Sequence, residues 1–125
     1  MYIAFESLIS LTMQYHIYIL FSENANKYYV GYSPNPQKRL NEHNSYLDKK
    51  KFTSKYQPWI LVCSFPVSQD KGEALKIERF IKKQKSKKFT LNIIANHKDT
   101  VFIQSIIAKA LSQSGPDKSG LIRRS

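Results

Sequence analysis

The 125-residue sequence contains one cysteine, few acidic residues and no long apolar run. A lone Cys63 excludes an internal disulfide and a cysteine-rich zinc site, and it fits a reducing cytoplasm. Because it lies in the apolar stretch WILVCSF, we expect it to be a core residue. No apolar run approaches the roughly 20 residues that a membrane span needs, so we predict one cytoplasmic globular domain without a membrane partner.

The scarcity of acidic residues leaves a formal net charge of +11, and this charge is concentrated in two blocks. Residues 71–88 contain eight Lys or Arg against two Glu, a net +6, and residues 38–56 contain six against two, a net +4. Such a directional field is typical of proteins that bind a phosphate backbone. We therefore predict binding of DNA, with RNA not excluded, through eight lysines: Lys38, Lys55, Lys76, Lys82, Lys83, Lys85, Lys87 and Lys88.

The two ends of the chain lack the patterning of its middle. Residues 1–14 have no basic leader and Glu6 interrupts their apolar stretch, which argues against a signal peptide. We interpret them as an N-terminal extension, with Met13 as a second candidate start. The tail 114–125 is predicted to be disordered.

Between these ends, apolar periodicity predicts a small α+β domain. Residues 15–21 and 28–32 read as a hairpin around the polar segment 22–27, and WILVCSF (59–65) reads as a buried strand ended by Pro66. Asn35 as N-cap and Pro36 at the first helical position predict a short helix between these strands. The predicted order β-β-α-β-α, followed by a C-terminal helix, gives a small α+β unit with a sheet covered by helices.

The second half of the chain reads mainly as helix. Ala74, Ile77 and Ile81 recur at helical spacing, which predicts a helix from Asp70 to about Lys85. We expect a short strand or extended segment at 89–94. A nearly uncharged C-terminal helix over 99–113, capped by Asp99, should pack either on the domain, taken as 15–98, or on a second copy as a homodimer.

Three groups of residues stand out from this pattern. Helical geometry places Glu78 at the edge of an apolar face, where it could pair with Lys82 or hold a divalent cation. Arg39 and His43 share one helical face, and Arg39 could either pair with Glu42 or clamp a phosphate. An even-numbered turn would place Tyr18 and Tyr29 on one sheet face, as aromatic packing or as part of a site.

Gly31 adds to the last group. A glycine inside a strand often marks the close approach of another backbone or of a ligand. We therefore expect something to approach the strand 28–32 closely at this position.

These residues occur in an order that resembles the GIY-YIG nuclease domain. The resemblance covers roughly residues 15–92 and rests on IYIL with Tyr18, YYVG with Tyr29 and Gly31, QKRLNEH with Arg39 and His43, and GEALKIERFIKK with Glu78. It is strongest to the short stand-alone bacterial members, which have a similar TSK…PW stretch. His16 replaces the first glycine of the family motif, and Val30 replaces an isoleucine.

The resemblance implies a compact fold with a three-stranded antiparallel sheet flanked by helices. It also implies a metal-dependent endonuclease that hydrolyses DNA phosphodiester bonds, in repair or recombination. It implies that Tyr18 acts as or assists the general base, Tyr29 orients water or phosphate, and Arg39 stabilises transition-state charge. His43 matches a histidine of many members, and Glu78 matches the ligand of the single divalent metal, Mg²⁺ or Mn²⁺. The candidate for the supporting asparagine of the family is Asn92, with Asn96 as the alternative.

Simple chemistry agrees with these roles, since phosphodiester cleavage needs an activated nucleophile and neutralised phosphate charge. A tyrosine of the site, with an ordinary pKa near 10, could be made more acidic by Arg39 and a bound metal. The alternative hypothesis is a catalytically weak nucleic-acid-binding module on the same fold. In either case, any targeting would come from a protein partner.

Overall fold

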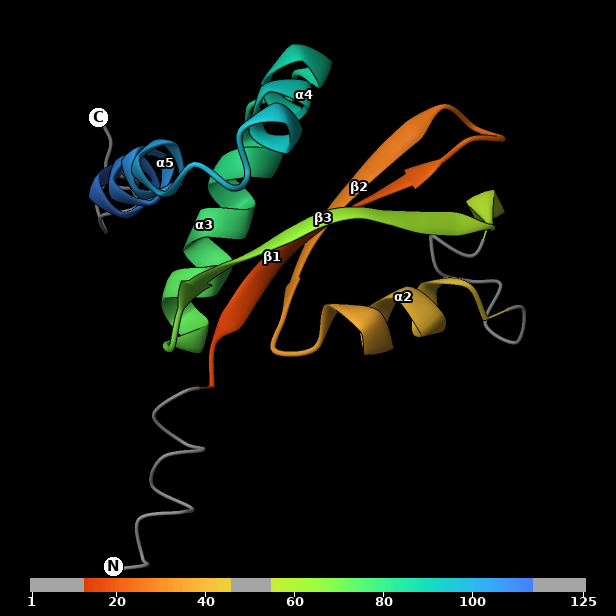
Figure 1. Cartoon of the computed structure of the whole chain (residues 1–125), viewed down its shortest axis with the longest axis horizontal. Helices are drawn as coiled ribbons and strands as arrows, with labels where there is room; N and C mark the ends of the chain where they lie inside the picture. Colours follow the sequence, from red (N-terminus) through yellow and green to blue (C-terminus); the bar gives the residue numbers. More distant parts are fainter. Residues whose placement is uncertain (1–12, 46–54, 114–125) are drawn as a thin grey trace, which may run out of the picture.

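The computed structural model describes residues 13–45 and 55–113 (Figure 1). The predictions for residues 1–12 and for the tail 114–125 lie outside the described residues. The order of elements is β1 (Tyr15–Ser22), β2 (Lys27–Ser33), α2 (Pro36–His43), β3 (Trp59–Ser68), α3 (Lys71–Lys83), α4 (Lys87–Ala95) and α5 (Thr100–Gln113). No helix among these residues is long and apolar enough to cross a membrane.

The three strands form one antiparallel sheet in the order β2-β1-β3, which confirms the predicted fold class. The hairpin pairs Ser22 with Lys27, so the turn has an even number of residues. Tyr18 lies opposite Gly31 and Leu20 lies opposite Tyr29, which confirms that both tyrosines share one face of the sheet. Because β2 is an edge strand, one of its sides is open to other groups.

The central strand β1 is buried on both faces. Ile17 and Ile19 join the larger core with α3, α4 and α5, whereas Tyr18 and Leu20 join a smaller cluster with Trp59 and the α2 residue Leu40. Alternating side chains point to opposite faces of a strand, so a strand covered on both faces has a continuous apolar sequence. Helix α2 therefore covers one face of the sheet, and α3, α4 and α5 cover the other (Figure 1).

The predicted helix starts are confirmed. Asn35 Oδ1 accepts from Lys38 N–H at 3.1 Å with Pro36 in the first turn of α2, and Asp70 Oδ2 accepts from Glu73 N–H at 2.8 Å at the start of α3. Asp99 Oδ1 similarly accepts from the N–H of Phe102 at 3.1 Å. Each cap satisfies a backbone donor that would otherwise have no intrahelical partner.

Two predicted elements are wrong. Residues 89–94 are not extended but belong to α4, because Ser86 caps its first turn and the fully buried Ile93 joins the larger core. Pro66 does not end the third strand, which continues to Ser68. Strand β3 is the other edge of the sheet, so no strand pairs with its outer side. The missing N–H of Pro66 therefore costs no hydrogen bond to another strand on that side.

Helix α5 packs on the domain, one of the two arrangements that the sequence left open. Four of its residues are buried in the core shared with α3 and the sheet: Ile103, Ile106, Ile107 and Ala110. The apolar face that a dimer seam would use is thus covered within one chain. The boundary at residue 98 and the homodimer stay predictions. Cys63 is buried in the same core, as predicted.

Candidate active site

A hollow of about 510 Å³ lies at the open edge of β2, between α2 on one face of the sheet and α3 on the other. Arg39 comes from α2, Glu78 comes from α3, and the tyrosines come from the strands. Its lining residues are Tyr15, Tyr18, Tyr29, Gly31, Tyr32, Ser33, Pro34, Arg39, Lys71, Leu75 and Glu78. Four of the predicted catalytic residues therefore lie around one hollow.

Tyr18 reaches this hollow because Gly31 has no side chain. A Cβ atom at position 31 would lie 2.5 Å from Tyr18 Cζ and closer still to the hydroxyl oxygen. The expected close approach is confirmed, but the approaching group is the phenol ring of the neighbouring strand rather than a backbone or a ligand. Tyr18 is 1% exposed, so only the end of its side chain can meet a substrate.

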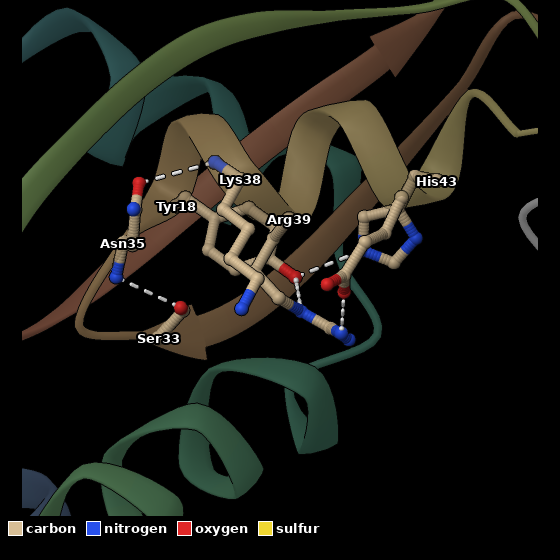
Figure 2. Close-up of polar contacts among 7 residues, drawn as sticks. Tyr18, Ser33, Asn35, Lys38, Arg39 and His43 are labelled. Atoms are coloured by element: carbon tan, nitrogen blue, oxygen red, sulfur yellow. Dashed lines mark hydrogen bonds and ion pairs between the residues drawn. The ribbon is translucent and has the colours of Figure 1, made fainter.

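Two side chains of α2 converge on the Tyr18 hydroxyl (Figure 2). His43 Nε2 lies 2.9 Å from the hydroxyl oxygen, and Arg39 Nε donates to it at 3.4 Å. Arg39 also forms the predicted ion pair with Glu42, whereas the alternative of a phosphate clamp stays a prediction. The i, i+4 spacing of Arg39 and His43 puts both groups on the same side of α2, one turn apart.

The pKa of Tyr18 corrects one expectation from the sequence. Burial raises it from 10.0 to about 12, and this effect exceeds the lowering by the Arg39 hydrogen bond and charge. Removing a phenolate from water disfavours its charged form, and a single guanidinium at 3.4 Å does not compensate for that loss. The expected lowering by Arg39 is therefore present, but burial outweighs it, and the effect of a bound metal on this pKa stays a prediction.

His43 is held by rings on both sides and by the chain segment that follows it. Its ring lies 4.8 Å from that of Tyr29 and 5.9 Å from that of Tyr18, centre to centre. The next residue, Asn44, accepts from Trp59 N–H at 2.7 Å and donates to Trp59 C=O at 3.0 Å. These paired hydrogen bonds attach the end of α2 to the start of β3.

Glu78 approaches the hollow from the opposite face of the sheet. Its side chain is 13% exposed, and Oε2 lies 3.3 Å from Lys82 Nζ, so the predicted ion pair exists. The same ammonium lies 4.9 Å from the centre of the Tyr29 ring. Lys82 is thus a resident cation between the candidate metal ligand and an aromatic ring of the site.

The donor set of the hollow suits a hard divalent cation held by a single carboxylate. Glu78 supplies a largely buried oxygen ligand, and the described residues contain no cluster of three or more His, Cys, Asp or Glu that could enclose a metal. Mg²⁺ typically keeps several waters and is bound through one or two carboxylates plus substrate phosphates. Glu78 therefore fits as the one protein ligand of such an ion.

Not every predicted residue belongs to this hollow. Asn92 lines a separate depression with Ser86, Lys88, Phe89 and Leu91, and its side chain accepts from Asn96 Nδ2 at 3.0 Å. Neither asparagine lines the hollow. The eight predicted nucleic-acid-binding lysines are all exposed, on α2, α3, α4 and the intervening segments. None of them lines the hollow either.

The sequence interpretation missed four polar or aromatic lining residues: Tyr15, Tyr32, Ser33 and Lys71. Tyr15 and Tyr32 form an edge-to-face pair with ring centres 6.2 Å apart. Parity places them on the α3 face of the sheet, opposite to Tyr18. Only the edge position of β2 lets a single hollow include both faces, and a hydrophobic pattern does not reveal which strand is at the edge.

Comparisons with known proteins agree with this geometry. The sequence model of the GIY-YIG catalytic domain matches residues 14–92. The structure-specific endonuclease subunit SLX1 of Phaeosphaeria nodorum is 39% identical over 67 residues, which make up 51% of this chain and 18% of that protein. The chain thus matches less than a fifth of that relative's length. The family match covers well over half of the chain and includes all the motif residues that line the hollow, so the chain belongs to the GIY-YIG catalytic domain family.

Proposed function

We propose that this protein is an endonuclease that hydrolyses DNA phosphodiester bonds with the help of one divalent cation. The observation that supports this most is the convergence of Tyr18, His43, Arg39 and Glu78 at the β2 edge. The relative is named a structure-specific endonuclease subunit, which favours a role in repair or recombination. Cytoplasmic location and a targeting partner belong to the same proposal.

The hydrogen bonds around Tyr18 indicate a route for the proton of an attacking water. With a pKa of about 12, Tyr18 is protonated at neutral pH and cannot act as a preformed phenolate. Its hydroxyl can donate to a neutral His43 Nε2 at 2.9 Å while accepting a proton from water. Tyr18 would then relay the proton to His43. The Arg39 guanidinium would stabilise the negative charge that develops on the Tyr18 oxygen during this transfer.

Glu78 and Arg39 have separate roles at the phosphate. Arg39 offers a fixed positive charge on the α2 side of the hollow, where charge develops during in-line displacement. A divalent cation on Glu78 would neutralise phosphate charge and acidify water or stabilise the leaving oxygen. Tyr29 packs against the His43 ring and would orient the reacting groups.

Two observations favour the second candidate, a nucleic-acid-binding module with weak catalysis. Burial makes Tyr18 a poor base without a partner, and Lys82 occupies the carboxylate that a metal would need. Under this alternative, the lysines bind a phosphate backbone and the hollow is a remnant of a catalytic site.

A cleavage assay separates the two candidates. Wild type, Glu78→Gln and the control Glu73→Gln are incubated with linear, single-stranded, flapped and branched DNA in Mg²⁺ or Mn²⁺. Glu73 lies on the same helix but is exposed and bonded to Ser68 Oγ at 2.7 Å. The nuclease predicts cleavage by wild type and Glu73→Gln, with a loss of about 100-fold or more in Glu78→Gln.

Other outcomes decide against parts of the proposal. If none of the three proteins cuts any substrate while all bind DNA in a salt-dependent way, the binding module is correct. Equal cleavage by Glu78→Gln and wild type would show that Glu78 is not the metal ligand. The homodimer prediction is tested separately, since sedimentation of a monomer at high concentration would reject it.

A further inference from the structure

The hollow at the β2 edge has a second half to which the proposed mechanism assigns no role. This half contains Tyr15 at the start of β1, Tyr32 near the end of β2 and Lys71 at the start of α3. Both tyrosines lie on the α3 face of the sheet, whereas Tyr18 and Arg39 line the hollow from the α2 side. We call Tyr15 and Tyr32 the tyrosine wall.

The end of β2 leaves the tyrosine wall open. Strand β2 ends at Ser33, which pairs with His16, so the preceding residue Tyr15 has no partner on β2. Tyr15 and Tyr32 are half-buried, and their rings form an edge-to-face pair with centres 6.2 Å apart and planes at 72°. Two rings at this angle form a corner with flat, apolar sides.

The polar groups in the two halves of the hollow differ in their hydrogen bonding. On the catalytic side, the Tyr18 hydroxyl is bonded to both His43 and Arg39. The two hydroxyls of the tyrosine wall form no hydrogen bond with another described residue, and neither hydroxyl oxygen is buried. Within the same part of the chain, the exposed Lys71 ammonium forms no ion pair. These polar groups are therefore available to a ligand.

The combination of flat rings and available polar groups suits a nucleobase. A base has two flat, apolar faces and a polar edge, and unpaired bases stack on aromatic side chains of proteins. Leu75 of α3 extends the apolar lining beside the wall. A sugar or a phosphate would use the ammonium and the hydroxyls but would gain little from the two rings. The wall therefore fits a base better than it fits the backbone.

We propose that the tyrosine wall binds an unpaired base of the nucleotide next to the cleaved phosphate, while Lys71 contacts a flanking phosphate. The wall and the catalytic groups line one hollow of about 510 Å³, so consecutive parts of one strand can reach both. This inference rests on the proposed function and gives it a substrate class, DNA with an unpaired nucleotide at the cleavage point. In a duplex the base must first be unstacked, which costs least where the strand is already unpaired.

The test compares two short DNA single strands of equal length, one made of thymidines and one with an abasic site in place of every base. The abasic strand keeps all sugars and phosphates, so the ratio of the two dissociation constants measures the contacts to bases. Fluorescence anisotropy without divalent cations measures both strands on each protein. Because the ratio is taken within one protein, a uniform change in affinity or in folded fraction cancels.

The protein variants are matched on β2. Tyr32→Leu removes the flat ring but keeps apolar volume against the larger core, and Tyr32→Phe keeps the ring without its hydroxyl. The control Tyr28→Leu changes a half-buried tyrosine on the same strand, sheet face and core, but outside the hollow. Lys71→Gln removes the proposed phosphate contact. Circular dichroism checks that each variant is folded.

For wild type we expect the abasic strand to bind about 5- to 100-fold more weakly than the thymidine strand, which is the effect of losing one stacked base. Tyr32→Leu should reduce this ratio to about threefold or less, whereas Tyr32→Phe and Tyr28→Leu should keep it. Lys71→Gln should weaken both strands alike and lower the salt slope by about 0.7, the value for one phosphate contact of a single strand.

The outcomes separate this inference from the proposed function. A ratio near one for wild type, or an unchanged ratio in Tyr32→Leu, would overturn the inference, and the nuclease would stand if wild type cleaves DNA. An equal fall of the ratio in Tyr28→Leu would also overturn it, because the effect would then come from the core. A ratio that depends on Tyr32 in a protein that cleaves no DNA would support the base-binding wall and reject the nuclease.

Discussion

Gly31→Ala tests whether the space above β2 determines the position of Tyr18. A methyl group at position 31 would lie 2.5 Å from Tyr18 Cζ, so either the ring or the strand must move. The ring is 1% exposed and packed within the smaller core, which leaves it little room. Overpacking of this kind costs about 1–3 kcal/mol of unfolding free energy. The same displacement would break the hydrogen bond between Tyr18 and His43.

Urea denaturation and DNA cleavage together measure both effects. The matched control is Gly72→Ala in the first turn of α3, where the nearest atom to a new Cβ is Asp70 Oδ2 at 3.2 Å. Because alanine favours helix over glycine by about 0.5–1 kcal/mol, this control should be neutral or slightly stabilising. We expect Gly31→Ala alone to lose stability and, at a temperature where it is folded, most of its cleavage rate.

A double-mutant cycle identifies the cause of that loss. In a Tyr18→Ala background the ring is absent, so Gly31→Ala should cost less than about 0.5 kcal/mol. An undiminished cost in that background would refute the reasoning, since the penalty would then come from the β2 backbone rather than from contact with Tyr18. Full activity and stability of the single variant would refute it equally.

Three further predictions concern the same site. Because burial raises the folded-state pKa of Tyr18 from 10.0 to about 12, the stability that its neutral form contributes is complete below pH 10 and is lost as the pH rises above 10. In urea denaturation, wild type should lose about 1 kcal/mol more unfolding free energy than Tyr18→Phe between pH 9 and 11. Parallel dependence of the two proteins on pH would contradict this. Lys82→Gln removes the ammonium that lies 3.3 Å from the Glu78 carboxylate, the candidate metal ligand. Calorimetry should therefore show about fivefold tighter Mn²⁺ binding, while the unfolding free energy changes by under about 0.5 kcal/mol. Unchanged Mn²⁺ affinity would argue against metal binding at Glu78. Asn44→Ala removes the side-chain amide that hydrogen-bonds to the N–H and C=O of Trp59, and it should cost about 1–3 kcal/mol of unfolding free energy. The control Asn41→Ala, at an exposed position of α2, should cost about 0.5 kcal/mol or less. Equal costs would show that the paired hydrogen bonds of Asn44 are unimportant.

The sequence was sufficient to predict features that depend on local spacing. Strand parity correctly placed Tyr18 and Tyr29 on one face, and the caps Asn35 and Asp70 correctly marked two helix starts. Each of these depends on residues at most a few positions apart or on a short hairpin. The family resemblance likewise rests on the order of motifs, which is a property of the chain and not of its packing.

Features that depend on tertiary context were missed. The segment FTLNII has aromatic and β-branched residues that favour a strand, but the Ser86 cap and the burial of Ile93 make it helical. The net shift of the Tyr18 pKa was missed because the sequence shows that Arg39 is near in the motif but not how deeply the phenol is buried. Propensity and motif spacing contain no information about solvation.

The edge position of β2 explains why these separate features form one site. Arg39 and His43 reach the Tyr18 hydroxyl from the α2 face, whereas Glu78 belongs to a helix packed on the other face. If β2 were an interior strand, the next strand of the sheet would separate the α2 side chains from Glu78. Because β2 is an edge strand, the side chains from the two faces can meet beyond it. The glycine at position 31 then leaves room for the Tyr18 ring beside β2. The catalytic hypothesis therefore depends on α2 and α3 keeping their positions on opposite faces of the sheet.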